Sequence, residues 1–351
     1  MARLSNLTSH AAGIWMGRAP DGRASVVVTV KAAWRWDAQG RLTPVPSALL
    51  DNDQFAGDPA TSGLVRAGER GPAKPRVDVL VQGALRFPAP VEQTVVSLRV
   101  GTRISKVVTV FGDRAWIPAV LRDMAPSRPR PVTRVPITWE RSWGGGDPAN
   151  PALVERRNPV GSGLSATPEA LSGQPAPSFE NPTQLIASWK DRPGPVGLGP
   201  IAPHWQPRIG LAGSYDDRWR KNRAPLLPDD FSPSFYNVAP ADQQLDEFRA
   251  GEEVRLGNMT ENGRDQFALP DLAAAVTLIC RQTVDEQHAT VDTIVIAPET
   301  CELSLLARAA FVPPAGLQAV REIVVGRLTA AHRRALDSGR RYLFRAGQRP
   351  A

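Results

Sequence analysis

Apolar and polar positions alternate with a two-residue period through much of the first third of the chain, as in half-buried β-strands. The run at 25–36 is rich in β-branched residues. The runs at 93–100 and 104–111 flank a short loop that begins with Gly101, and this arrangement predicts a hairpin. Two further strands are predicted at 76–87 and 132–139.

The strand pattern returns in the last third of the chain. Apolar runs there predict strands at 275–281, 292–297 and 302–311. The run at 317–325 fits either a strand or a helix. Residues 329–337 predict a helix, because Thr329 can cap its start and Gly339 can end it. His332 lies on this helix beside two arginines, so we expect it to be exposed.

The middle of the chain, from about residue 142 to 250, has a different character. Prolines recur every few residues and glycine-rich turns separate them. Proline fixes φ and lacks a backbone donor, so long helices and ladders are excluded here. The segment also contains large aromatic residues that a disordered linker would lack, namely Trp189, Trp205, Trp219, Phe231, Phe235 and Tyr236. We therefore expect an ordered but irregular segment packed on a β scaffold.

Together these patterns predict a mainly β fold, either a β-sandwich or a distorted barrel, with a short C-terminal helix. The chain has 351 residues, which is enough for one large domain. We expect a single domain over 1–345, β-rich at 5–141, irregular at 142–250, and β-rich with the helix at 251–345. A frayed tail is expected at 346–351. The 34 prolines and 29 glycines argue against a helical bundle or coiled coil.

The net charge of +7 raises the possibility of nucleic-acid binding. Of the 42 basic residues only five are lysines, and the arginines are spread along the chain with acidic residues among them. Nucleic-acid-binding tails usually carry blocks of five or six like charges, and none occurs here. Aromatic residues make up only 6% of the chain, too few for extensive base stacking. We therefore expect the arginines to be solvated surface residues and not a nucleic-acid-binding surface.

The two cysteines, Cys280 and Cys301, are expected to be packed, reduced thiols. The N-terminus lacks a signal-peptide pattern, and no apolar run is long enough to span a membrane. We therefore expect a cytoplasmic protein that binds no membrane and needs no cofactor or metal.

Several residues could carry chemistry, but none forms a competent site. The acidic pairs Asp216-Asp217 and Asp229-Asp230 are more typical of turns than of catalysis. The Gly197–Gly199 stretch lacks the spacing of a dinucleotide fingerprint. His204 is expected to pack against Trp205, and the four histidines show no metal-ligand spacing. A catalytic serine elbow is also absent.

Residues 213–244 carry the most distinctive pattern in the chain. They contain Tyr-Asp-x-x-Trp, then Pro-Leu-Leu-Pro-x-Asp-Phe, then Phe-x-Asn-x-Ala-Pro-x-Asp-Gln. In this order the motifs resemble the signature of a bacterial family, domain of unknown function 2169. The resemblance spans about residues 5 to 325, and Ser142 stands where the family has alanine. Further matching motifs lie at 111–116, 139–145, 157–161, 199–208 and 292–296.

The resemblance implies a non-enzymatic accessory protein of the bacterial type VI secretion system. Such an adaptor or chaperone would bind the PAAR or PAAR-like N-terminal region of a toxin effector and help to load the effector onto the VgrG spike. The residues that carry the signature, or that would bind the partner, are Tyr215, Arg218, Trp219, Arg220, Arg223, Pro225, Leu227, Pro228, Asp229, Phe231, Phe235, Asn237, Pro240 and Gln243.

Segment 213–244 can act in two ways. It could bind the partner, with Arg218, Trp219, Phe231 and Phe235 as anchors, or it could hold the fold together, and we favour the second role. Two alternatives come from other classes of protein. One is a hydrolase or carbohydrate-active enzyme that uses Asp216, Asp229 and Asp230, and the other is a nucleic-acid binder.

Overall fold

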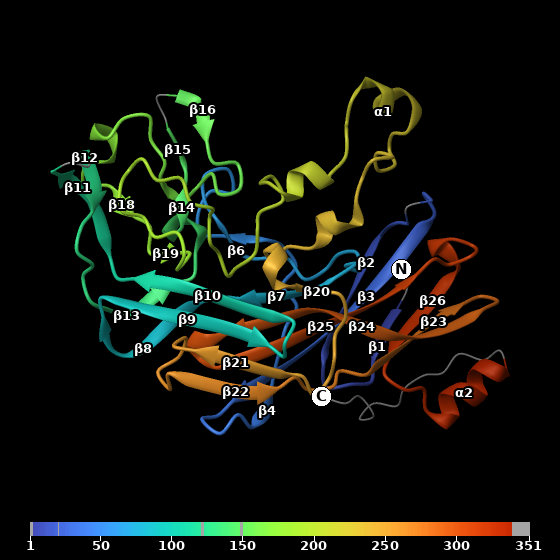
Figure 1. Cartoon of the computed structure of the whole chain (residues 1–351). Helices are drawn as coiled ribbons and strands as arrows, with labels where there is room; N and C mark the ends of the chain where they lie inside the picture. Colours follow the sequence, from blue (N-terminus) through green and yellow to red (C-terminus); the bar gives the residue numbers. More distant parts are fainter. Residues whose placement is uncertain (1–2, 20, 121–122, 148–149, 339–351) are drawn as a thin grey trace.

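The computed structural model describes residues 3–19, 21–120, 123–147 and 150–338. Its largest element is a ten-stranded, nearly closed, barrel-like sheet in which β1 and β2 are the ends of the main strand order (Figure 1). The order is β1 (Arg3–Asn6), β26 (Val320–Val325), β23 (Ala274–Cys280), β24 (Val284–Ala297), β25 (Glu302–Phe311), β3 (Ala24–Trp36) and β2 (Ala11–Arg18), with β4 (Leu42–Val45) on β3, β7 (Val77–Val81) on β24, and β20 (Gln244–Leu245) on β7.

Two pairings in this sheet are parallel and join distant parts of the chain. β1 pairs with β26, so that Arg3 lies opposite Glu322. β24 pairs with β23 along its first half and with β7 along its second half. The change of partner coincides with a bulge between Val291 and Thr293, which turns Asp292 into the space beside β7.

A second, five-stranded sheet packs against the first. Its order is β19 (Phe179–Glu180), β10 (Ile104–Phe111), β9 (Gln93–Val100), β21 (Glu253–Gly257) and β22 (Arg264–Ala268). β8 (Ala84–Val91) and β13 (Val132–Pro136) form a separate pair. One continuous apolar core lies between the sheets, and Val79, Leu98, Val108, Leu256 and Leu305 are nearly inaccessible there. This is the mainly β, barrel-like fold that the alternating patterns predicted.

Residues 112–192 form a lobe beside the second sheet, seen at the upper left of Figure 1. Its short strands surround a cluster that includes Trp116, Trp143 and Ile186. The Arg114 guanidinium pairs with the buried Glu180 carboxylate at the base of the lobe. Its strands are β11 (Arg114–Ala119), β12 (Asp123–Pro126), β14 (Trp143–Gly144), β15 (Gly146–Asp147), β16 (Asn150–Val154), β17 (Ser162–Gly163) and β18 (Pro175–Ala176).

The remaining elements are short. A hairpin joins β5 (Gln54–Phe55) to β6 (Leu64–Arg66). The α-helices are α1 (Asp217–Asn222) and α2 (Ala330–Asp337). The 3-10 helices are η1 (Trp139–Arg141), η2 (Glu169–Leu171), η3 (Arg208–Leu211), η4 (Pro233–Tyr236), η5 (Ala241–Gln243), η6 (Pro298–Thr300) and η7 (Leu317–Ala319).

The predicted hairpin at 93–111 is confirmed residue by residue, since β9 and β10 have the expected bounds. Two other predictions need correction. The run at 76–87 is two strands, because Gly83 with φ of +87° breaks it. The run at 132–139 ends as a strand at Pro136. The run at 317–325, which fitted either a strand or a helix, is a 3-10 turn followed by a strand.

Helix α2 begins as predicted, since the Thr329 side chain accepts a hydrogen bond from His332 N (3.1 Å). Gly339 and the tail at 346–351 lie outside the described residues. The expected exposure of His332 is wrong, because its side chain is fully buried. The helix covers the outer face of β23 and β26, where Leu328 and Leu336 pack on Ile279 and Val324. His332 is therefore on the covered face of the helix.

Burial lowers the pKa of His332 below its ordinary value of 6.5, and burial does the same to the half-buried His10. The unfolded chain then binds more protons than the folded chain as the pH falls through 6.5, so stability should fall on acidification. We expect His332→Leu to reduce this loss, with His10 responsible for part of the remainder. Urea unfolding at pH 7.5 and 5.5 measures the loss of stability in the wild type and in the variant. An equal loss in both proteins would contradict the prediction.

Candidate functional site

Segment 213–244 divides into two parts with different surroundings. Residues 213–231, which we call the arm, project from the body of the molecule and carry α1 at their tip (Figure 1). Residues 232–245, which we call the inner part, run back along the barrel-like sheet and end as β20 on β7. The two roles considered for this segment thus fall on different residues.

The arm has a narrow neck closed by hydrogen bonds. Ser214 donates from its backbone N and its Oγ to the Asp230 carboxylate, at 2.9 and 2.8 Å. Ser232 N donates to Leu211 O at 3.0 Å just below. Gly213 has a φ of +80°, and a Cβ there would lie 2.8 Å from Pro228, so the neck requires glycine.

Inside the arm, side chains tie the turn to itself. The Trp219 indole donates to Leu226 O (2.8 Å), and its ring lies edge-on to Tyr215 with centroids 4.7 Å apart. Asp216 caps α1 by accepting from Trp219 N (2.8 Å). Arg223 donates to Leu227 O at 3.0 Å. These contacts hold the arm in one shape.

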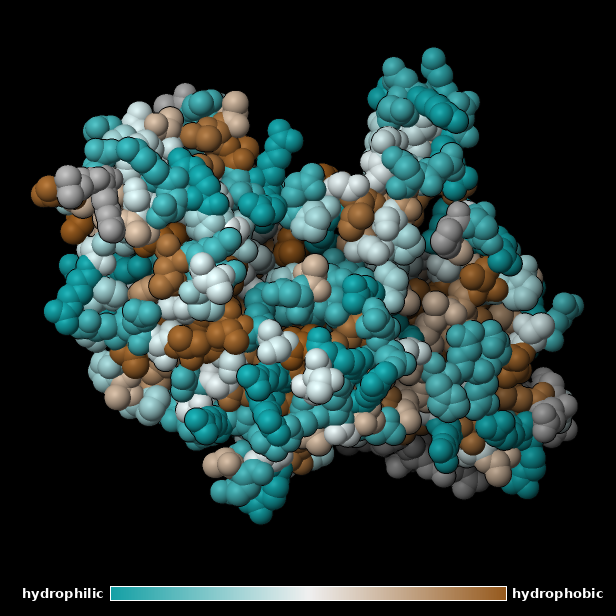
Figure 2. Space-filling view, viewed as in Figure 1, coloured by the Kyte–Doolittle hydropathy of each residue, from teal (hydrophilic) through white to brown (hydrophobic). Residues whose placement is uncertain are grey.

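The arm makes limited contact with the body and exposes polar groups. Leu226 lies against Gly22, in the turn between β2 and β3. Tyr215 is 50% exposed. Within the described part of the chain, Arg218 and Lys221 have no ion-pair partner, whereas Arg220 pairs with Asp217 at 2.7 Å. Figure 2 shows the arm as a mainly hydrophilic projection, separated from the lobe by a broad depression.

The acidic residues proposed for a hydrolase serve the local structure of the arm. Asp216 is the cap of α1, and Asp217 is paired with Arg220. Asp229 lies 3.2 Å from Arg223. Hydrogen bonds from Ser214 lower the pKa of Asp230, which keeps it ionised at the neck. These four carboxylates therefore act in turns and ion pairs.

At the base of the arm, aromatic rings pack on η3. Phe231 lies 5.8 Å from Phe235 and 5.4 Å from Tyr236, measured between ring centroids. The Arg208 guanidinium lies 5.0 Å from the Phe235 ring and donates to Ile201 O (2.6 Å). Burial lowers the pKa of Arg208 to about 10. Phe231 and Phe235 thus join the arm to the body, unlike Tyr215 and Arg218.

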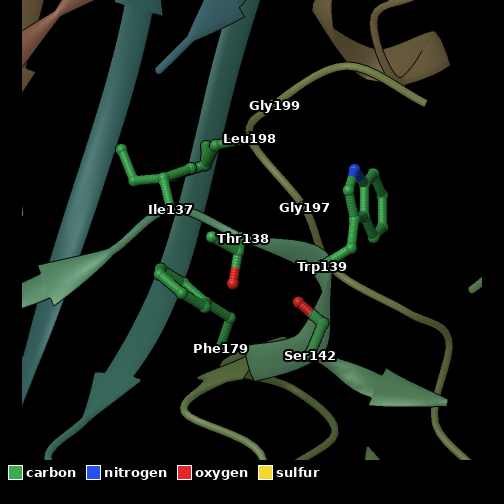
Figure 3. Close-up of a pocket in the computed structure, with 8 residues that line it drawn as sticks. All are labelled: Ile137, Thr138, Trp139, Ser142, Phe179, Gly197, Leu198 and Gly199. Atoms are coloured by element: carbon green, nitrogen blue, oxygen red, sulfur yellow. The ribbon is translucent and has the colours of Figure 1, made fainter. Parts of the chain in front are cut away.

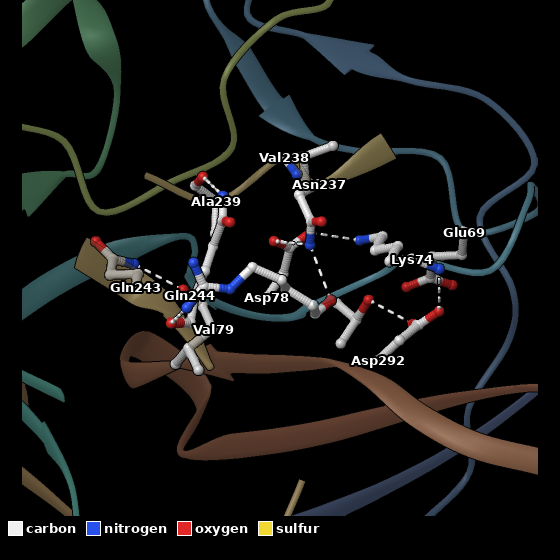
Figure 4. A network of polar contacts seen from close by, with 12 residues as sticks. Glu69, Lys74, Asp78, Val79, Asn237, Val238, Ala239, Gln243, Gln244 and Asp292 are labelled. Carbon is white, nitrogen blue, oxygen red and sulfur yellow. Dashed lines mark hydrogen bonds and ion pairs between the residues drawn. The ribbon is translucent and has the colours of Figure 1, made fainter. Parts of the chain in front are cut away.

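The inner part is fixed to β7 by two buried amides (Figure 4). Asn237 Nδ2 donates to Asp78 Oδ1 (2.9 Å) and Arg76 O (2.8 Å), while Val238 N donates to Asp78 Oδ2 (2.9 Å). Gln243 Nε2 donates to Val79 O (2.7 Å) and to a loop carbonyl at residue 198 (2.9 Å). These hydrogen bonds tie the inner part to β7 and to the loop at residue 198.

The sequence model of one protein family matches residues 21–308, which is most of the chain and includes the arm and the inner part. The description of the family is "uncharacterized protein conserved in bacteria", domain of unknown function 2169 (DUF2169). The chain belongs to the DUF2169 family. No curated protein and no solved structure matches the chain.

Beneath the inner part, the DUF2169 chain buries a network of charges. Lys31 donates to Glu69 (2.6 Å) and Lys74 to Asp78 (2.7 Å), and Arg308 pairs with Asp292. Three cations and three anions leave the network neutral, which offsets part of the cost of burying them. Sequence reasoning missed this network. The signal that could have revealed it is the presence of charged residues inside apolar strand runs, namely Lys31, Asp78, Asp292 and Arg308.

The Gly197–Gly199 stretch of the DUF2169 chain packs against the Trp139 ring (Figure 3). A Cβ on Gly197 would lie 2.4 Å from the Trp139 ring. The Trp139 indole donates to Pro200 O at 2.7 Å, and Leu198 O accepts from Val81 N at 3.0 Å. The cavity beside it is about 10 Å³, room for about one water molecule.

The remaining candidates are also structural. His204 packs edge-on against Trp205 and accepts its indole hydrogen bond (3.0 Å), as expected. Cys280 and Cys301 are free thiols. Among the described residues, no group of three or more His, Cys, Asp or Glu side chains could hold a metal ion. Nor does any helix in the described ranges have the length and apolarity to cross a membrane.

Proposed function

We propose that this DUF2169 protein is a non-enzymatic adaptor that binds a type VI secretion toxin through its PAAR-like N-terminal region and helps to load it onto the VgrG spike. The arm is the observation that carries the proposal. It contacts the body through its base and Leu226, yet it is braced by its own hydrogen bonds. A segment that contributes so little to the core is available for a partner.

The exposed chemistry of the arm suits protein recognition. Tyrosine and arginine are enriched at binding hot spots, and Tyr215 and Arg218 are both exposed on the arm. A braced loop loses little conformational freedom when a partner docks, which favours affinity. Because Arg218 and Lys221 lack ion-pair partners in the described part of the chain, the surface of the partner should be acidic.

The assignment as an adaptor draws on two lines of support. The first is membership of the DUF2169 family, for which the resemblance described above implies an accessory role in type VI secretion. The second is the role of Asp216, Asp229 and Asp230 in turns and ion pairs, which leaves the hydrolase alternative without a supporting geometry.

Co-purification with a PAAR-bearing toxin from the same bacterium tests this function. We expect Arg218→Glu combined with Lys221→Glu to weaken binding about tenfold or more, because each reversed charge faces the acidic partner. The matched control is Arg321→Glu combined with Arg327→Glu, two exposed arginines on β26 and just after it that likewise have no ion-pair partner in the described part of the chain.

Both double variants should melt close to the wild type, since all four side chains are exposed. Full retention of the toxin by the arm variant would show that the arm is not the binding surface. Failure of the wild-type chain to hold the toxin would overturn the adaptor function itself.

A further inference from the structure

The five-stranded sheet has an open edge along the first half of β10. β19 pairs with β10 only at Thr109 and Val110. If the pairing continued in this register, Val107 would lie opposite residue 182, which is a proline and has no N–H to donate. The chain leaves the sheet at that point, and Ser105 and Val107 are exposed.

The direction of the free backbone groups follows from the ladder. Phe111 N donates away from β9 to Ser178 O, and Gly112 N donates toward β9 to Glu92 O. Because backbone groups alternate in direction along a strand, those of Ser105 and Val107 point to the open edge. Two N–H and two C=O groups are thus available there for another strand.

A groove of about 460 Å³ runs along this edge, a volume typical of ligand-binding pockets. Lys106 and Asp242 lie in this groove, and Asp242 belongs to the inner part. Ser105 and Val107 also line it, together with residues from facing loops that include Asn181, Pro195, Gly197 and Pro240.

Lys106 is buried at the floor of the groove although its neighbours on β10 are exposed. Its ammonium donates to Gly197 O (2.7 Å) and to Asp242 Oδ1 (2.9 Å), which leaves one of its three N–H donors for another acceptor. Asp242 is 60% exposed, so its second oxygen can accept a hydrogen bond. Burial lowers the pKa of Lys106, and Asp242 opposes that shift.

We infer that the edge of β10 binds an extended segment of a partner protein as an added strand, with an uncharged polar side chain opposite Lys106. In an antiparallel pair, the residue opposite Lys106 places its side chain on the same face and therefore into the groove. An amide or hydroxyl can accept from Lys106 and donate to Asp242. Because Lys106 and Asp242 already neutralise each other, a charged side chain would bring an uncompensated charge into the groove, so both carboxylates and ammonium groups are disfavoured.

The inference rests on the proposed function in one respect, since the toxin is the partner that would supply the added strand. The binding test therefore uses peptides that are independent of the toxin. Random octapeptides displayed on phage are selected on the wild-type chain. We expect enriched peptides with Ser, Thr, Asn or Gln at one fixed position. Their binding should protect the amides of Ser105 and Val107 from hydrogen exchange.

Val107→Pro should weaken these peptides about tenfold, because it removes an edge donor without touching the pairing with β9. Ala268→Pro is the matched control, on the opposite edge of the same sheet, and should change affinity less than about twofold. Its N–H also points outward, since Leu269 N donates inward to Glu252 O.

A second measurement leaves the chain unchanged, in case Val107→Pro disturbs folding. N-methylation of a selected peptide at the two residues whose N–H groups face β10 should abolish binding, whereas methylation at the alternate residues should not. Lys106→Met should shift the selected side chain from polar to apolar.

An inward-pointing lysine on an edge strand can also serve only to prevent strand association. In that case no peptide is enriched on the wild type, or the enriched peptides bind Val107→Pro equally well, and the inference is wrong. Toxin binding that survives Val107→Pro while the peptides lose affinity would instead mean that the toxin docks through the arm alone.

Discussion

Replacing Asp78 with alanine is expected to lower the free energy of unfolding by about 3–5 kcal/mol. The carboxylate is completely buried and accepts hydrogen bonds from Lys74, Asn237 and Val238. Its removal leaves the Lys74 ammonium, only 9% exposed, without its counter-charge. Urea unfolding followed by tryptophan fluorescence measures the loss.

Asp246→Ala is the matched control for this substitution. Asp246 also pairs with a basic residue next to β7, since it lies 2.8 Å from Arg76, but its side chain is 90% exposed. Exposed pairs contribute about 0–1 kcal/mol, so this variant should unfold close to the wild type. Equal losses in the two variants would mean that burial of the inner part does not stabilise the fold.

Replacing Trp139 with alanine should cost about 3–5 kcal/mol, the range for a large buried aromatic residue. The ring packs edge-on against Trp205, with centroids 6.0 Å apart, and it fills the space against Gly197. It also joins η1 to the 195–200 loop through its bond to Pro200 O. The variant therefore loosens the cover of the barrel-like sheet.

The same substitution at Trp219 gives the comparison. Its indole is bound within the arm, to Leu226 O, and takes no part in the main core. Trp219→Ala should change global unfolding by less than about 1 kcal/mol, because the arm opens as a local unit. A loss as large as that at Trp139 would show that the arm and the barrel-like sheet unfold together.

The sequence predicted best those elements whose contacts are local. The 93–111 hairpin follows from two alternating runs around Gly101, and α2 follows from its Thr329 cap. The irregular middle segment was recognisable because prolines and aromatic residues occur together in it. In each case the deciding interaction lies within a few residues along the chain.

What the sequence did not predict depends on contacts between distant positions. Lys31 finds its counter-charge at Glu69, and Asn237 finds its acceptor at Asp78, 159 residues away. The sequence also did not show that the signature divides after Phe231 into the arm and the inner part. The motif runs on without a break there, although the arm is exposed to solvent and the inner part packs on the sheet. His332 was misplaced because its polarity suggested exposure, although it lies on the face of α2 that covers the sheet.

The parallel pairing of β1 with β26 has a consequence for synthesis of the protein. Residues Arg3–Asn6 pair only with Glu322–Val325, and Ser5 bonds the Glu322 carboxylate. At ribosomal rates of about 5–20 residues per second, the first strand leaves the ribosome roughly 15–60 s before its partner is made. β7 waits similarly for β24. The nascent chain therefore carries unpaired strand edges until β24 and β26 have been made.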